Sequence, residues 1–314
     1  MKAFLQVYIK CILLLGCVIS CITNVSAQTE TDGIMMRQKN LCTGFIYGYS
    51  SWENYWEGTL KRNNENLGKV STQMIGWMGS YGITNKINVI VGLPYVKTKA
   101  SAGTLHGVDG LQDLSITGKW NFVDKDVWHG DLKLIAVAGV SFPTTNYVAD
   151  YQPLSIGLKS NNLTFRLIGD YDYKHFFITW AAAYVLRSNI KIDRESYYTT
   201  EMHLTNEVQM PDAANFQIRT GYRGNIVVAE LLVSNWTTLG GFDITRNNMP
   251  FPSNKMNATM VGANAKYNPG FVPGLSVLGG GSYTVAGRNM GQAYMLNAGL
   301  FYVFDFNAKR KSSK

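Results

Sequence analysis

The feature of this sequence that most constrains its fold is the spacing of the breaks between its alternating segments. Beyond about residue 43 the chain divides into roughly a dozen short runs in which polar and apolar residues alternate. The breaks between successive runs are long and short in turn. This pattern is typical of a transmembrane β-barrel, in which long loops join strands on the outer side of the membrane and tight turns join them on the inner side.

The predicted fold is all-β, a transmembrane antiparallel barrel of about twelve strands over residues 43–306. The predicted strands cover residues 43–52, 69–82, 87–98, 113–122, 131–142, 155–173, 176–188, 214–223, 226–237, 255–268, 275–286 and 292–306. An even number brings both ends of the barrel to the periplasmic side, and closure leaves no unpaired strand edge in lipid. Because boundaries carry errors of a few residues, ten or fourteen strands also fit the pattern.

The lengths of the breaks carry more weight than the alternation itself, because soluble β-sandwiches also alternate. Long breaks fall at residues 53–68, 99–112, 143–154, 189–213 and 238–254, and a short one of the same class falls near 287–291. The other breaks are tight, except for residues 123–130, which form a break of intermediate length. No stretch beyond the N-terminal region approaches the ~20 apolar residues that a membrane helix needs.

The N-terminal residues 1–27 have the pattern of a cleaved secretory signal peptide. Lys2 and Lys10 precede an apolar core over residues 11–22. Small residues at 25–27 form a cleavage site, so the mature chain is expected to start near Gln28. A second interpretation takes Val18 to Cys21 as a lipoprotein box with a lipidated Cys21. The expected localisation is the cell outer membrane, with the signal peptide cleaved near Ala27.

The charge of the chain is concentrated at its ends. The chain has 29 Lys and Arg against 21 Asp and Glu, a net charge of +8, but residues 1–27 hold two of these excess cations and the basic tail at 307–314 holds four. The barrel region is left near neutral, so we predict no nucleic-acid partner. With the leader removed, Cys42 is the sole cysteine, and neither a disulfide nor a metal-type spacing is present. We predict no cofactor.

Charged residues fall on the polar face of several predicted strands. A lysine or arginine on the lipid face near the membrane centre would cost ~2–4 kcal/mol, so these side chains are expected to line the lumen. The candidates are Lys119, Lys133, Arg166, Asp170, Asp172, Arg219, Glu230 and Lys266. They suit either an open polar pathway or a plugged lumen held by ion pairs. Residues 28–42 are either a periplasmic lead-in or a segment that folds into the lumen.

The first long break is rich in aromatic residues. Trp52, Tyr55 and Trp56 lie beside two glutamates there. Aromatic side chains at this place in a barrel either meet an apolar solute at the mouth or belong to the upper aromatic girdle.

Catalytic groups are not predicted, because the patterns of two enzyme classes are matched only in part. An outer-membrane phospholipase places a histidine two residues before its serine on a strand, and the nearest match is His203-Leu204-Thr205, in a loop and with threonine instead of serine. An outer-membrane protease needs paired acidic groups and a histidine at the mouth, and only Asp109, Asp113 and His106 approach that pattern. His129 and His175 fall near inner turns and form no cluster.

Several motifs resemble a known family of outer-membrane barrels, the one named for the MetA pathway of phenol degradation. The motifs are Tyr47 to Gly58 in the first strand and loop, Tyr81 to Lys86 followed by Gly92 to Val96, Gly110 to Leu114, and Phe142 to Thr144. The resemblance is strongest over residues 44–145. It implies a transporter of small, often hydrophobic or aromatic compounds, and it brings no catalytic residues.

The expected function is therefore passive passage of small molecules through an outer-membrane barrel. Its expected partners are outer-membrane lipid, a small-molecule solute and the barrel-assembly machinery. The alternatives are a lipid-acting, phospholipase-like enzyme and a structural or adhesive barrel whose long loop over residues 189–213 binds a partner.

Overall fold

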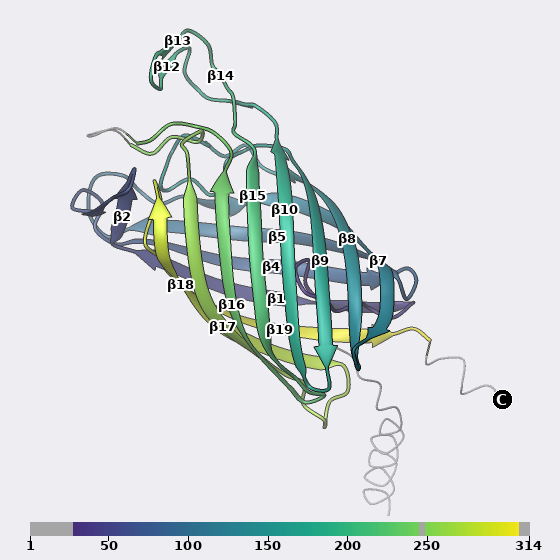
Figure 1. The fold of residues 1–314 in the computed structure, drawn as a ribbon. Helices are drawn as coiled ribbons and strands as arrows, with labels where there is room; N and C mark the ends of the chain where they lie inside the picture. Colours follow the sequence, from purple (N-terminus) through teal and green to yellow (C-terminus); the bar gives the residue numbers. More distant parts are fainter. Residues whose placement is uncertain (1–27, 245–248, 308–314) are drawn as a thin grey trace, which may run out of the picture.

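A computed structural model describes residues 28–244 and 249–307 of the chain. The predicted signal peptide, the lipoprotein box at Cys21 and the basic tail beyond residue 307 lie outside the described residues. The structure is a closed antiparallel barrel whose long strands are arranged around a single axis (Figure 1). In the described part of the chain, no helix is both long enough and apolar enough to cross a membrane.

Twelve long strands form the wall of the barrel, as the sequence predicted. They are β1 (Asn40–Trp52), β4 (Val70–Gly82), β5 (Ile87–Ala100), β7 (Asp113–Val127), β8 (Gly130–Pro143), β9 (Asn162–Tyr173), β10 (Phe176–Arg187), β15 (Ala213–Arg223), β16 (Val227–Thr238), β17 (Asn257–Tyr267), β18 (Leu275–Arg288) and β19 (Tyr294–Asp305). Each strand pairs with the next one along the chain, and the register Asn40↔Asp305 to Ser51↔Tyr294 joins β1 to β19 and closes the wall.

Short strands occupy the long connections at one end of the barrel. They are β2 (Asn54–Glu57), β3 (Leu60–Asn63), β6 (Asp109–Leu111), β11 (Ile190–Lys191), β12 (Tyr197–Tyr198), β13 (Met202–His203) and β14 (Glu207–Val208). The β12–β13 hairpin projects furthest from the barrel (Figure 1). In an outer-membrane barrel the end with long loops is extracellular and the end with tight turns is periplasmic.

The outer face of the wall is apolar. Large side chains such as Phe45 and Leu231 are 60% and 64% exposed there. Alternate residues of the same strands point inward and are largely polar, as the strand period of two requires. A water-soluble protein could not expose so much apolar surface, whereas lipid solvates it.

One predicted break is shorter than expected. β7 continues to Val127 and β8 begins at Gly130, so the connection that was predicted over 123–130 consists of Trp128 and His129 alone. Both residues have positive φ, 47° and 67°. A two-residue turn with two positive φ angles normally uses Asn or Gly, so Trp128 and His129 are not recognisable as a turn from the sequence. The Tyr171 hydroxyl supports the turn by donating to the carbonyl oxygens of Val127 and Trp128.

One predicted strand is too long. The strand expected from residue 155 begins at Asn162, because residues 155–161 belong to an outer loop. Leu154 and Ile156 are buried within that loop region rather than in the wall. Their alternation therefore reflects packing among the outer loops and not a strand.

Candidate solute pathway

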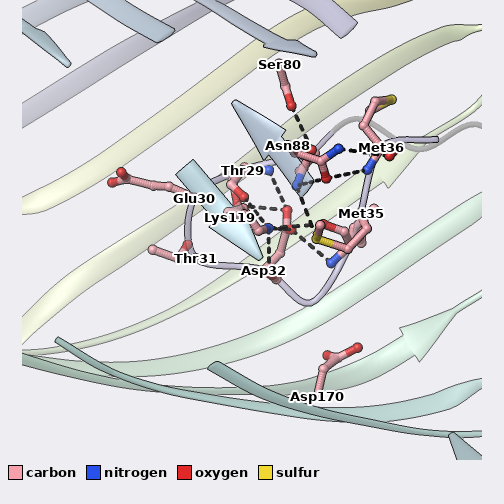
Figure 2. A network of polar contacts seen from close by, with 12 residues as sticks. Thr29, Glu30, Thr31, Asp32, Met35, Met36, Ser80, Asn88, Lys119 and Asp170 are labelled. Carbon is pink, nitrogen blue, oxygen red and sulfur yellow. Dashed lines mark hydrogen bonds and ion pairs between the residues drawn. The ribbon is translucent and has the colours of Figure 1, made fainter. Parts of the chain in front are cut away.

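The described chain begins inside the barrel. Residues 28–38, which we call the lumen loop, turn back on themselves between the strands and lead into the start of β1 (Figure 2). Two contacts hold the base of this loop. The Ser80 hydroxyl on β4 donates to Gln28 Oε1 at 2.7 Å, and the Met36 amide donates to Asn88 Oδ1 on β5 at 2.9 Å. The segment that the sequence left undecided therefore lies in the lumen.

Lys119 on β7 is the main attachment of the lumen loop (Figure 2). Its Nζ donates to the backbone oxygens of Thr29, Asp32 and Ile34 at 3.0, 2.9 and 3.0 Å, and it lies 3.2 Å from Asp32 Oδ1. The Lys119 side chain is 0% exposed. A buried ammonium group is stable only when it is paired and fully hydrogen-bonded, and the fold of this loop supplies those acceptors.

The tip of the lumen loop contacts the opposite wall. Arg166 on β9 donates to the Glu30 carbonyl oxygen at 2.9 Å, and Arg219 on β15 donates to Thr31 Oγ1 at 2.6 Å. Gly33 lies against Asp170, since a Cβ atom at position 33 would be 2.0 Å from the Asp170 Cγ. The loop thus spans the lumen between β7 on one side and β9 and β15 on the other.

A second group of charges lies below the loop near the periplasmic end. Arg223 on β15 pairs with Asp170 at 2.9 Å and with Asp172 at 2.6 Å, and Lys133 lies 3.9 Å from Asp172. The guanidinium group of Arg223 also lies over the Phe177 ring, 4.1 Å from its centroid. Asp170 is 0% exposed, so the arginine compensates a carboxylate that water does not reach.

The third group lies beside the loop. Arg219 pairs with Glu230 on β16 at 3.1 Å, and the Asn264 amide donates to the same Glu230 oxygen at 2.9 Å. Lys266 on β17 lines the neighbouring cavity. Opposite charges are therefore paired both around Arg223 and around Glu230.

Two cavities flank the lumen loop. The first, of about 260 Å³, lies between the loop and the wall formed by β1, β4, β10 and β15–β19. Its apolar lining consists of Ile34, Ile46, Met78, Phe177, Val228, Leu278 and Phe301, and its polar lining includes Arg219, Arg223, Glu230, Asn264, Lys266 and Asn297. The second, of about 240 Å³, lies toward β7–β10, β15 and β16. Glu30 and Arg166 line it together with serine, threonine and asparagine side chains, three valines and Trp236.

All eight charged residues that the sequence nominated lie on the inner face of the wall. Lys119, Arg166 and Arg219 contact the lumen loop, while Asp170, Asp172 and Lys133 belong to the group around Arg223. Arg223 was not among the predicted lumen residues, although it has the same strand parity as Arg219 and parity alone places it inward. Ser80 and Asn88 were not predicted either, because nothing in the sequence distinguishes uncharged side chains that contact the loop.

The three mouth aromatics lie at the extracellular end, packed among the loops. Trp52 belongs to an apolar cluster with Leu67, Val70 and Leu154. Trp56 is buried and lies so close to Gly287 that a Cβ atom there would be 2.5 Å from its ring. The ring centroids of Trp52 and Tyr55 are 6.2 Å apart. These rings consolidate the extracellular end of the barrel.

The residues of the two catalytic patterns form hydrogen bonds with other partners. His203 Nε2 lies 2.9 Å from the Thr199 hydroxyl, while Thr205 Oγ1 accepts from the Glu207 amide. The Asp113 carboxylate accepts a hydrogen bond from Tyr147, and that of Asp109 accepts one from Tyr95. Across residues 28–244 and 249–307, no three His, Cys, Asp or Glu side chains are grouped as they would be around a metal ion.

Comparison with solved structures supports the fold. The chain is similar to the COG4313 outer membrane channel from Pseudomonas putida F1, with a TM-score of 0.70 and 12% identity over 89% of this chain and 100% of that one. Weaker similarities are to the translocator domain of the autotransporter NalP from Neisseria meningitidis (TM-score 0.45, 11% identity, 85% and 88% coverage) and to the TodX monoaromatic hydrocarbon channel (0.42, 9%, 86% and 91%). No family model matches the chain, and neither does any curated protein sequence.

The closed wall and its apolar outer face thus define a transmembrane β-barrel of the outer-membrane type, a fold that the chain shares with the COG4313 channel. At 12% identity the similarity establishes a shared fold and no more. The resemblance to the barrels named for the MetA pathway stays a prediction.

Proposed function

We propose that this protein is an outer-membrane channel for small molecules that combine an apolar ring or chain with a polar group, and that the lumen loop closes it at rest. The observation that carries the proposal is the pair of cavities, one on each side of a loop that is attached by side chains rather than by strand pairing. Passage needs no cofactor and no chemical step in this mechanism.

The chemistry of the first cavity supports this solute class. Phe177, Met78 and Phe301 provide apolar surface, while Arg219, Glu230 and Asn264 provide hydrogen-bonding groups at its edge. Binding sites for small ligands have this composition, an apolar lining with a few placed polar groups. A cavity of roughly 150 Å³ accommodates benzene, so about 260 Å³ suits a single substituted ring.

The attachment of the lumen loop supports a closed resting state. The loop contacts β4, β5, β7, β9 and β15, so it crosses the lumen rather than lying along one wall. The contacts are hydrogen bonds and ion pairs in a polar lumen, and none of them belongs to the ladder that closes the barrel. The loop can therefore leave its position without unfolding the wall.

Liposome swelling with the full chain and with a variant that lacks residues 28–36 tests the proposal. The solutes are phenol and benzoate, with glucose as a polar solute of comparable size. We expect the deletion to increase swelling several-fold, and the aromatic solutes to enter faster than glucose through both forms. Equal rates for the three solutes would contradict the solute class, and an impermeable deletion variant that still folds would contradict the channel itself.

A lipid-acting enzyme gains no support from the arrangement of its candidate residues. The incubation of the protein with phospholipid in detergent checks this directly, because a phospholipase would release fatty acid and the channel releases none. An adhesive function of the loop over residues 189–213 rests on its length alone.

A further inference from the structure

Two lysines lie on the lipid-facing side of β5 near its extracellular end. On the inner side of this segment Val96 and Thr98 are buried, and the Thr98 hydroxyl donates to the Leu154 carbonyl oxygen within the outer loops. Since successive side chains of a strand point to opposite faces, Lys97 and Lys99 point outward, and both are exposed.

The strand register places other polar groups beside these lysines. Lys99 lies opposite Ser71 on β4, and Lys97 lies opposite Gln73, which is in turn opposite Tyr49 on β1. Lys69 lies just before β4, with its Nζ 5.7 Å from the centroid of the Tyr294 ring. We call the group Lys69, Lys97, Lys99, Gln73, Tyr49 and Tyr294 the outer basic patch.

The outer basic patch lies at the upper border of the apolar outer face. The next outward residues toward the membrane centre are apolar or aromatic, among them Ile75 and Tyr47, and both are exposed. Tyrosine and lysine side chains at such a border lie at the depth of the lipid head groups. The patch is confined to one side of the barrel, since the outermost outward residues of β7, β8, β9 and β10 are Leu114, Phe142, Leu163 and Leu186.

The patch carries more positive than negative charge. Neither Lys97 nor Lys99 forms an ion pair with another residue of the described chain. The nearest acidic residue in the register is Asp109, opposite Lys97 on β6, and its carboxylate accepts a hydrogen bond from the Tyr95 hydroxyl. Glu53 lies near Lys69. Three ammonium groups against two carboxylates leave the patch suited to an anionic partner.

We propose that the outer basic patch binds the phosphorylated sugar head group of lipopolysaccharide, the lipid of the outer leaflet. Lys97 and Lys99 pair with its phosphates through charge-assisted hydrogen bonds, while Gln73 and the tyrosine hydroxyls contact the sugars. The acyl chains of the same molecule lie on the apolar rows below. The inference depends on the outer-membrane location of the barrel and not on channel activity.

Thermal unfolding of the full chain in detergent tests the site, because a ligand that binds the folded state raises the melting temperature. The probes are bisphosphorylated lipid A, the same lipid without its phosphates, and inorganic phosphate. We expect only the first to raise the melting temperature. The double variant Lys97→Ala/Lys99→Ala is expected to bind it roughly thirtyfold more weakly, since each lysine near an anionic surface contributes about 1 kcal/mol and about 1.4 kcal/mol corresponds to a factor of ten.

Controls separate the site from general charge effects. The double variant Lys125→Ala/Lys174→Ala removes two exposed lysines from the periplasmic end and should bind as the wild type does, and so should Lys97→Arg/Lys99→Arg. If the lipid without phosphates raised the melting temperature of the wild-type protein as much as lipid A does, that result alone would overturn the proposal. Unchanged affinity of the Lys97→Ala/Lys99→Ala variant for lipid A would also overturn it. So would a control variant whose affinity for lipid A falls as much as that of Lys97→Ala/Lys99→Ala.

Discussion

The Nζ of Lys119 on β7 lies 3.2 Å from Oδ1 of Asp32 in the lumen loop, although 87 residues separate them in the chain. The same Nζ donates to three backbone oxygens of the loop, and the side chain is completely buried. One ammonium group thus organises the turn of the loop and fixes it to the wall. Lys119 makes four hydrogen bonds to the loop from a single side chain.

Replacing this lysine should release the loop. Lys119→Met leaves the Asp32 carboxylate buried without its partner, which costs about 3–5 kcal/mol in comparable pairs. Because the strand ladder is untouched, we expect the loop to leave its place while the barrel stays folded. Planar-bilayer recordings should show a higher open probability, and hydrogen exchange should show lost protection of residues 28–38.

Two variants serve as controls for that prediction. Lys125→Met changes an exposed lysine on the same strand near the periplasmic end and should leave both measurements unchanged. Lys119→Met/Asp32→Asn removes the uncompensated charge and should recover part of the protection, as coupled residues do in a double-mutant cycle. Unchanged protection of the loop in Lys119→Met would contradict the attachment role of this residue.

A steric change at the tip of the loop should have a similar effect. In Gly33→Ala the new methyl group would lie 2.0 Å from the Asp170 Cγ, so either the loop or the buried carboxylate must move. Channel recordings should show increased conductance. Gly270→Ala is the matched control, because no heavy atom lies within 4 Å of a Cβ atom there. Identical recordings for both variants would show that the tip tolerates displacement without opening the lumen.

Ion selectivity should follow the charges beside the second cavity. Arg166 Nη1 and Glu30 Oε2 are 3.9 Å apart, and both residues line this cavity. Arg166→Gln should raise the cation-to-anion permeability ratio on the order of two- to threefold, and Glu30→Gln should lower it by a similar factor, since charged side chains set selectivity in a narrow lumen. Reversal potentials in a salt gradient measure both. A shift in the same direction for the two variants would place the ion path elsewhere.

The outer loop around Asp243 should loosen only in strong acid. The Arg288 guanidinium, 2.7 Å away, and the Asn289 amide hold the pKa of the Asp243 carboxyl below its ordinary value of about 3.8, while partial burial opposes them. A lowered folded-state pKa means that the contact stabilises the loop fully above that ordinary value and is lost as the pH falls through the folded-state pKa.

Hydrogen exchange of the loop between Leu239 and Met256 checks this expectation. Protection should be unchanged between pH 7 and pH 5 and should fall below about pH 3.8. Asp243→Asn should reproduce the acid behaviour at pH 7. Loss of protection near pH 6 in the wild type would point to a histidine instead.

The number of strands and the direction of most side chains were predictable from the sequence. The long outer breaks and the alternation of Leu114 and Ile116 with Ser115 and Thr117 identified both the barrel and its faces, because lipid and lumen impose a strict period of two. Where local chemistry departed from that rule, prediction failed. The turn at Trp128 and His129 has positive φ angles without glycine or asparagine, and Leu154 and Ile156 alternate because they pack among the loops.

By itself, then, the sequence determined a closed barrel with charges inside it. Lipid on one face and the lumen on the other require alternating apolar and polar residues in each strand, so the pattern can be recognised in every short segment. Tertiary structure alone decided what those charges do. The lumen loop has no periodic pattern, and its place depends on contacts such as Lys119 with Asp32 and Arg219 with Thr31, which are 87 and 188 residues apart. Such contacts form only when the wall has closed around the loop, so no local segment of the chain records them.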